Sequence, residues 1–261
     1  MKILTPHLKY AVLIPLLSLT MCSFSQAAVR FHNTGTTSGW DGRNLDPNCS
    51  VTDSSSQTYK GGDSIKSQVN YNSGYTGRYH AMMFRNGVYH PGDTGFYGFA
   101  FYLMNSWSFT SQQYQLFQFI ADFTGNCGET WMPSTMIWIQ GNQLTTRRKY
   151  GTACAQQIQQ YNNLASVSAG SWHRIVVQAS WKSDSTGFLK LWYDGSKVLE
   201  QFNIATTVAD GSNRYFRMDV GIYANSWHDE HRLVGTQGTR YAYFDQIGWG
   251  TAFADADPAQ W

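Results

Sequence analysis

Two stretches decide the fold: GSWHRIVV at residues 170–177 and GFLKLWYDG at residues 187–195. In both, apolar and polar residues alternate, which is the period of a half-buried β-strand. A polar bend separates them, and the second ends in Asp-Gly, a dipeptide that favours tight turns between antiparallel strands. The two stretches are therefore predicted to form a hairpin of a β-sandwich.

The same alternation recurs along the chain in short runs bounded by glycine, asparagine and aspartate. Strands are predicted at residues 64–71, 78–84, 95–104, 113–122, 135–140, 172–180, 187–193, 215–223 and 241–249. That many short strands need two sheets. The quoted hairpin also resembles the concanavalin-like jelly-roll domains, so the predicted fold is an all-β jelly roll, a two-sheet antiparallel sandwich. Residues 28–261 show no linker or internal repeat and are expected to form a single domain.

Residues 1–27 have the features of a secretory signal peptide. Lys2 and Lys9 lie near the start, an apolar run spans residues 11–19, and Ser25-Gln26-Ala27 places small residues where signal peptidase cleaves. We therefore expect a secreted protein, extracellular or periplasmic. A lipid anchor on Cys22 is the alternative, although the preceding Thr20-Met21 fits that signal poorly.

The charge balance argues against nucleic acid as the partner. The chain has 19 Lys and Arg against 17 Asp and Glu, and the signal segment removes two lysines and no acid. The remaining chain is formally neutral, whereas sequence-independent nucleic-acid binding needs a basic excess. No later segment is long and apolar enough to span a membrane. We expect a monomer that contacts neither nucleic acid nor membrane.

Three cysteines remain after the signal segment: Cys49, Cys127 and Cys154. In an oxidising compartment, Cys127 and Cys154 are the expected disulfide because they flank one hairpin-like stretch. Cys49 would then be free. The sequence by itself leaves this connectivity open.

Two other chemistries lack the residues they require. A glycoside hydrolase uses two carboxylates facing each other across a cleft, but the predicted strands contribute few acids, among them Asp122, Asp219 and Asp245. A zinc site would need a distant ligand beyond the local cluster at residues 228–231. Neither hydrolysis nor zinc catalysis is therefore expected.

Polar side chains in two predicted strands indicate a cleft. Alternation places Arg78 and His80 on the same face of one strand, where the alternative to a shared cleft is a surface arginine and a hydrogen-bonded structural histidine. In another, Gln118 shares a face with Leu116 and Ile120. A buried amide without a hydrogen bond costs about 1–3 kcal/mol, so Gln118 must either brace a loop or meet a polar ligand.

A third predicted strand, residues 215–223, carries polar side chains on one face around Gly221. These side chains are Tyr215, Arg217, Asp219 and Tyr223. Such a face is more typical of a cleft wall than of a core, and Asp219 is placed to hold an arginine.

Taken in order, these motifs resemble the jelly-roll polysaccharide lyases, most closely the glucuronan lyases. They are GYTGRYH at residues 74–80, the strand with Gln118, GSWH and WYDG in the quoted hairpin, GIY at 221–223 and YFDQI at 243–247. Alginate lyases of the same fold have a strand that residues 215–223 resemble with two extra residues. Their Gln-Ile-His motif reads Gln118-Phe119-Ile120 here, which argues against an ordinary alginate lyase.

The resemblance implies a secreted endo-acting lyase that cleaves a β-1,4-linked polyuronate, an anionic polysaccharide. Glucuronan is the first expected substrate and alginate the alternative, while a non-catalytic lectin-like module is the rival function. The resemblance makes His80 the base, Tyr223 the acid and Gln118 the amide that binds the substrate carboxylate, assisted by Arg78. Tyr223 serving as both base and acid is the alternative, and no catalytic cofactor is expected.

These residue types suit β-elimination, which removes the proton on C5 of a uronate and expels the oxygen on C4. The ionised carboxylate beside C5 cannot take up the developing charge, so donors such as Gln118 and Arg78 must neutralise it. A neutral histidine accepts the proton, and a neutral tyrosine protonates the leaving oxygen. In glucuronate both atoms lie on one side of the ring, so base and acid are expected to approach from one side.

Further candidates are proposed for substrate and metal binding. Residues expected to bind or stack on sugar rings are Arg217, Tyr215, Tyr102, Tyr97 and Trp138, with core packing as the alternative for each aromatic. Jelly rolls of this kind often hold a structural calcium ion, for which Asp245 is the best ligand and Gly62-Asp63 a second source of oxygens. A turn role for Asp63 is the alternative.

Overall fold

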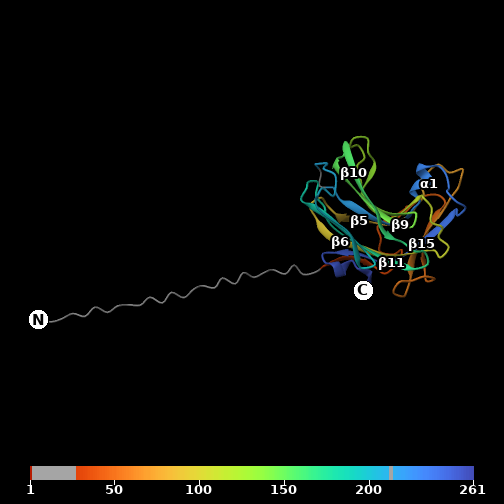
Figure 1. Ribbon diagram of the computed structural model, residues 1–261, viewed down its shortest axis with the longest axis horizontal. Coiled ribbons are helices and arrows are strands. Elements are labelled where there is room, and N and C mark those ends of the chain that lie inside the picture. The colour runs from red at the N-terminus through yellow and green to blue at the C-terminus, as the bar shows by residue number, and fades with distance from the viewer. Residues whose placement is uncertain (2–27, 212–213) are drawn as a thin grey trace.

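The computed structural model describes residues 1, 28–211 and 214–261 (Figure 1). The predicted signal peptide therefore lies, apart from Met1, outside the described residues and stays a prediction. The described part forms two antiparallel sheets stacked face to face, which confirms the predicted jelly-roll sandwich. None of its helices is long and apolar enough to cross a membrane.

The first sheet is built from eight strands. Their bounds are β1 (Val29–Asn33), β3 (Cys49–Ser54), β4 (Ser64–Asn70), β6 (Thr94–Leu103), β11 (Trp172–Ser180), β12 (Gly187–Tyr193), β13 (Ser196–Ile204) and β15 (Thr239–Gly250). They are ordered β13-β12-β11-β6-β15-β4-β3, and β1 pairs with β15.

The second sheet is built from seven strands. Their bounds are β2 (Gly42–Leu45), β5 (His80–Tyr89), β7 (Gln113–Asp122), β8 (Trp131–Gln140), β9 (Gln143–Thr152), β10 (Ala155–Ser166) and β14 (Phe216–Tyr223). Their order is β10-β9-β8-β7-β14-β5-β2. A short helix, α1 (Asn225–Asp229), follows β14, and two 3-10 turns, η1 (Phe253–Asp255) and η2 (Pro258–Gln260), end the chain.

The hairpin predicted from residues 170–195 is confirmed as β11 and β12, which pair antiparallel. Its Asp-Gly turn is held by a side chain as well as by the backbone. Asp194 accepts hydrogen bonds from the ring Nδ1 of His173 at 2.8 Å and from the backbone N–H of Arg174 at 2.7 Å. One motif residue thus fixes the turn to the strand that begins the hairpin.

Aromatic side chains fill the space between the sheets. Phe99 of the first sheet stacks on Phe117 of the second, with ring centroids 5.3 Å apart, and both are fully buried. A bulge in β7 between Gln115 and Phe117 breaks the alternation there, so Leu116 packs in the core. The expectation that Leu116 shares a face with Gln118 was therefore wrong.

The strands that the sequence did not predict are β1, β2, β3, β9, β10 and β13. Four of them, β13, β3, β10 and β2, are the edges of the two sheets. An edge strand is covered on fewer sides than a central one, so its sequence need not alternate strictly. The polar β10, with six glutamine and asparagine residues among its twelve, is the extreme case.

The predicted disulfide between Cys127 and Cys154 is present and joins the β7–β8 connection to the β9–β10 turn. Cys49 is a free, half-buried thiol, and burial raises its pKa to about 12. It is therefore a packed, unreactive thiol at neutral pH.

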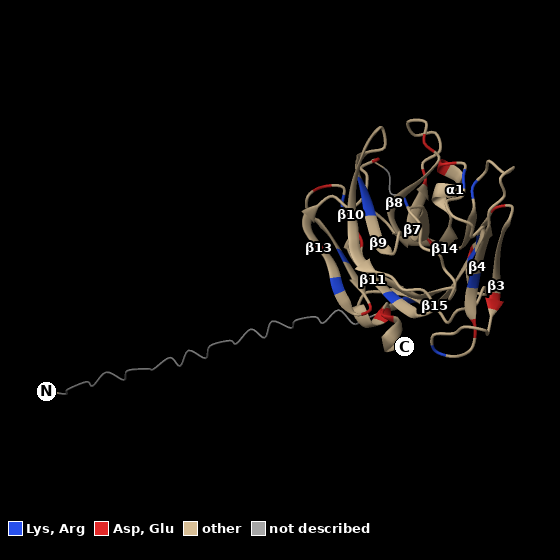
Figure 2. Ribbon diagram, turned by 45° about the vertical axis from the view of Figure 1, so that its right-hand side comes forward, with Lys and Arg blue, Asp and Glu red and all other residues tan. Residues whose placement is uncertain are grey.

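In Figure 2 charged residues are scattered over both sheets, and β10 and α1 lie on either side of the exposed face of the second sheet.

Candidate active site

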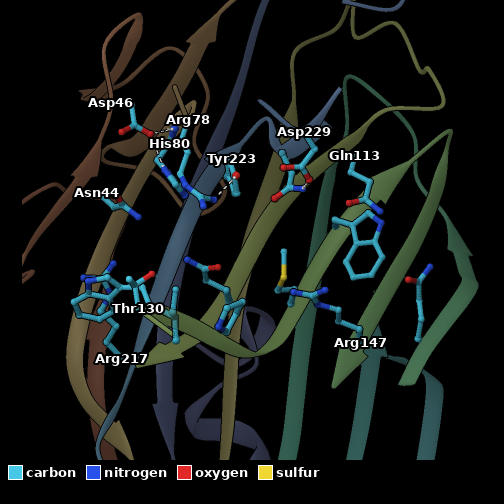
Figure 3. Close-up of a pocket in the computed structure, with 18 residues that line it drawn as sticks. Asn44, Asp46, Arg78, His80, Gln113, Thr130, Arg147, Arg217, Tyr223 and Asp229 are labelled. Carbon is cyan, nitrogen blue, oxygen red and sulfur yellow. Dashed lines mark hydrogen bonds and ion pairs between the residues drawn. The ribbon is translucent and has the colours of Figure 1, made fainter. Parts of the chain in front are cut away.

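A groove of about 630 Å³ lies on the face of the second sheet that is turned away from the core (Figure 3). Of the residues predicted from the sequence, those that line it are Arg78, His80, Gln118, Trp138, Arg217 and Tyr223. The structure therefore brings together all four proposed catalytic residues. Arg78 reaches the groove from the loop before β5 rather than from the strand itself.

Strand register places the central residues in one row across the sheet. His80 pairs with Tyr223, Tyr223 with Gln115, and Gln115 with Trp138. Directly paired residues share a face, so strands far apart in the sequence bring His80, Tyr223 and Trp138 to the same groove. Gly221, with φ +144°, allows the close approach of β14 to β5, because a β-carbon there would collide with the backbone of the opposite strand.

His80 is held by Asp46, which follows β2. Oδ2 of Asp46 lies 2.6 Å from the ring Nδ1 of His80 and accepts its backbone N–H at 2.9 Å. Although burial opposes the shift, these hydrogen bonds lower the pKa of Asp46. Asp46 is therefore ionised and can only accept, so Nδ1 must donate. This fixes the proton on Nδ1 and leaves Nε2 of neutral His80 as a proton acceptor.

Tyr223 lies against His80, with ring centroids 3.9 Å apart. Its hydroxyl oxygen accepts a hydrogen bond from Nη1 of Arg78 at 3.0 Å. Burial raises the pKa of Tyr223 to about 12, against the opposing charge of Arg78. The phenol is therefore neutral at ordinary pH and keeps its own proton for donation.

The side-chain amide of Gln118 is held in place by a hydrogen bond to Asp219. Its Nε2 donates to Oδ2 of Asp219 at 2.9 Å, which leaves a second N–H on the same nitrogen. Asp219 is fully buried, and burial raises its pKa, against the opposing effect of Arg217. The ion pair between Nε of Arg217 and Oδ1 of Asp219, at 2.8 Å, confirms that Asp219 holds an arginine.

Three aromatic residues predicted to bind sugar do not lie in this groove. Tyr97 and Tyr102 are in β6 of the first sheet. Tyr97 packs in the core and accepts a hydrogen bond from Trp181, and Tyr102 packs beside Trp172. Tyr215 precedes β14 and packs on His90 outside the groove. Strand alternation gives the face of a side chain but not the sheet to which the strand belongs.

Several groove residues were missed by the sequence analysis. They are Asn44, Asp46, Gln113, Trp131, Arg147, Gln160 and Asp229. Asp46 lies in an Asp-Pro turn, Trp131 begins β8, and Arg147 and Gln160 are in the polar strands β9 and β10. Nothing in the local pattern marks them as functional, because an isolated polar residue in a turn or edge strand is ordinary.

Two of the three metal ligands predicted from the sequence, Asp245 and Asp63, lie beside Gly35. A β-carbon placed on Gly35 would lie 2.8 Å from Oδ1 of Asp245 and would collide with the carbonyl oxygen of Asp63. Asp245 is fully buried, and the described residues offer it backbone N–H donors but no ion pair. An oxygen-lined space with an unpaired buried carboxylate fits calcium.

The remaining ligands of such an ion would have to be backbone oxygens or water. Among the described residues, no group of three or more His, Cys, Asp and Glu side chains is placed to hold a metal. Gly62 precedes the Asp63 carbonyl in the same exposed loop.

The jelly roll and its groove define a class of protein. A histidine with a free Nε2, a neutral tyrosine beside it and a braced amide are the groups needed to remove and return protons next to a carboxylate. The two carboxylates that line the described groove, Asp46 and Asp229, are not a free pair, since Asp46 is bound to His80 and Asp229 accepts a hydrogen bond from Asn225. The arrangement is that of a lyase rather than a hydrolase.

Comparisons with known proteins identify the family. The model of the polysaccharide lyase family matches residues 32–248, so this chain belongs to that family and is a polysaccharide lyase. An endo-β-1,4-glucuronan lyase from the fungus Trichoderma reesei is 46% identical, with a TM-score of 0.87 over 90% of this chain and 100% of that chain. An alginate lyase from a Chlorella virus shares the fold, with a TM-score of 0.57 and 14% identity over 82% of this chain and 93% of that one. A search of the curated proteins gave no significant match.

Proposed function

We propose that this chain is a secreted, endo-acting lyase that cleaves glucuronan by β-elimination. The stacked pair of His80 and Tyr223, with Gln118 in the same groove, is the observation that carries the proposal. The 46% identity to a glucuronan lyase supports the choice of polymer. The disulfide between Cys127 and Cys154 supports export to an oxidising compartment, which N-terminal sequencing of the exported protein would test.

In the proposed reaction, each residue has one task. The second N–H of Gln118 and the guanidinium of Arg78 face the uronate carboxylate and stabilise the charge that grows on it. Nε2 of His80 accepts the proton from C5, and the electron pair left behind forms the double bond between C4 and C5. The bond from C4 to the glycosidic oxygen breaks, and the hydroxyl of Tyr223 protonates that oxygen.

The geometry suits a substrate whose reacting atoms lie on one side of the ring. Because the rings of His80 and Tyr223 are stacked, the base and the acid approach from the same wall of the groove. The raised pKa of Tyr223 favours the acid role for this residue, since a tyrosinate base would be scarce below about pH 12. Glucuronan meets this requirement, with both reacting atoms on one side of the sugar.

Purified protein should release unsaturated products from glucuronan, detected by the ultraviolet absorbance of the new double bond. Alginate and pectate, offered separately at equal uronate concentration, are the comparison substrates. A rise with alginate alone would replace glucuronan by alginate as the substrate. Retention of a polymer in a gel-shift assay without any rise in absorbance would contradict the lyase activity and favour the lectin-like function.

We also propose that Asp245 and the Asp63 carbonyl hold a structural calcium ion beside Gly35. Excess calcium should raise Tm by about 5–10 °C over the protein in chelator, because binding at about 100 times Kd contributes about 2.7 kcal/mol. Asp245→Asn should abolish this response. Asp63→Asn is the matched control, since it keeps the backbone carbonyl and should keep the response. Equal Tm values of the original protein with calcium and with chelator would contradict the site.

A further inference from the structure

Arg147 is the cation in the groove that has no partner among the described residues. Three arginines line the groove. Arg78 is hydrogen-bonded to Tyr223, and Arg217 is paired with Asp219. Arg147 forms no ion pair with the described residues, and its Nε is buried without a hydrogen-bond partner.

The environment of Arg147 is unfavourable for an isolated charge. Burial lowers the pKa of its guanidinium, and the exposed Asp229 opposes the shift only from a distance. A partly buried cation without a partner is costly, and a bound anion would remove that cost. Figure 3 shows Arg147 across the groove from His80 and Arg78.

Strand register gives the position of Arg147 relative to the reaction centre. Gln118 of β7 pairs with Met136 of β8, which pairs with Arg147 of β9. Neighbouring strands are spaced about 4.8 Å apart, so the backbone of Arg147 lies about 10 Å from that of Gln118. This separation exceeds the width of one sugar ring, so the backbone of Arg147 lies beside a different sugar from the one whose carboxylate Gln118 binds in the proposed reaction.

We propose that Arg147 binds the carboxylate of a second uronate, one or two sugars along the chain from the residue that reacts. This inference rests on the proposed function. The groove then binds two carboxylates of the chain. Gln118 and Arg78 bind the carboxylate of the reacting uronate, and Arg147 binds that of a second uronate. A neutral sugar at the second place would leave the guanidinium without its partner.

The test uses Arg147→Met on glucuronan and on glucuronan oligosaccharides of increasing length. The variant should lose about tenfold or more in kcat/KM on the polymer, mostly through KM, because a hydrogen bond between charged groups is lost. The shortest oligosaccharide that the original enzyme cleaves, which does not reach Arg147, should be cleaved at nearly the original rate. Arg147→Lys should recover part of the loss on the polymer.

Lys149→Met is the matched control. Lys149 is two residues along β9, and its Nζ donates to Gln156 rather than lining the groove. The control removes one charge from the same strand, and its kcat/KM on the polymer should stay within about twofold of the original.

An equal loss on short and long substrates, or no loss on either, would overturn the role of Arg147. Failure of the original enzyme to cleave any polyuronate would contradict the proposed function instead. Affinity electrophoresis in glucuronan-containing gels then tests Arg147 alone. Weaker retardation of Arg147→Met than of Lys149→Met supports the carboxylate contact, and equal retardation contradicts it.

Discussion

Replacement of His80 by glutamine is expected to lower kcat on glucuronan by about a hundred- to ten-thousand-fold, the usual contribution of a general base. The amide side chain is similar in size but cannot accept the C5 proton. The measurement is the initial rate of product absorbance at saturating polymer. Tm should change by only a few degrees, because one partly buried contact with Asp46 is lost.

The matched control for this variant is His173→Gln. His173 is also bonded to an aspartate through Nδ1, at 2.8 Å from Asp194, and also stacks on a tyrosine, Tyr193. It belongs to β11 of the first sheet, away from the groove. Its replacement should therefore reduce stability but not kcat. Full activity of His80→Gln would contradict the role of His80 as base and would favour Tyr223 as the base.

The pH dependence separates the same two mechanisms. With His80 as base and Tyr223 as acid, kcat/KM does not rise with the ionisation of Tyr223 in the alkaline range. With Tyr223 as base, kcat/KM would keep rising through the alkaline range, because burial holds the pKa of Tyr223 at about 12. Asp46→Asn should also lower kcat, since the carboxylate that fixes the tautomer of His80 is lost.

Tyr223→Phe is expected to lower kcat by about a hundred- to ten-thousand-fold with little change in KM. The ring and its stacking on His80 remain, while the proton for the leaving oxygen is lost. Burial makes this proton available over the whole neutral range, because it raises the pKa of the phenol. Initial rates and KM on glucuronan check the result.

Tyr241→Phe is the matched control for the hydroxyl. Tyr241 is half-buried in β15 of the first sheet and lies outside the groove, so its replacement should leave kcat unchanged. A Tyr223→Phe enzyme that retained most of its kcat would contradict the acid role, and water or Arg78 would have to supply the proton.

The sequence was sufficient to predict most of the central strands of both sheets. Strands such as β6, β7 and β11 are covered by neighbours on both sides, so their alternation or apolar content is strict. It also contained the motifs whose resemblance to the jelly-roll polysaccharide lyases nominated His80, Gln118 and Tyr223. The sequence did not predict the bulge at Leu116, since a bulge depends on the pairing of β7 with β8.

The sequence by itself determined the sandwich, the hairpin at residues 170–195 and the residue types available for elimination. Only the tertiary structure decided which of these residues meet. His80 is hydrogen-bonded to Asp46, which lies 34 positions away in the sequence. Tyr223 is hydrogen-bonded to Arg78, which lies 145 positions away. The physical reason is that alternation acts within one strand, whereas a groove is made by the pairing of strands and by the loops that cover them. The same reason excludes Tyr97 and Tyr102 from the groove and brings in Arg147.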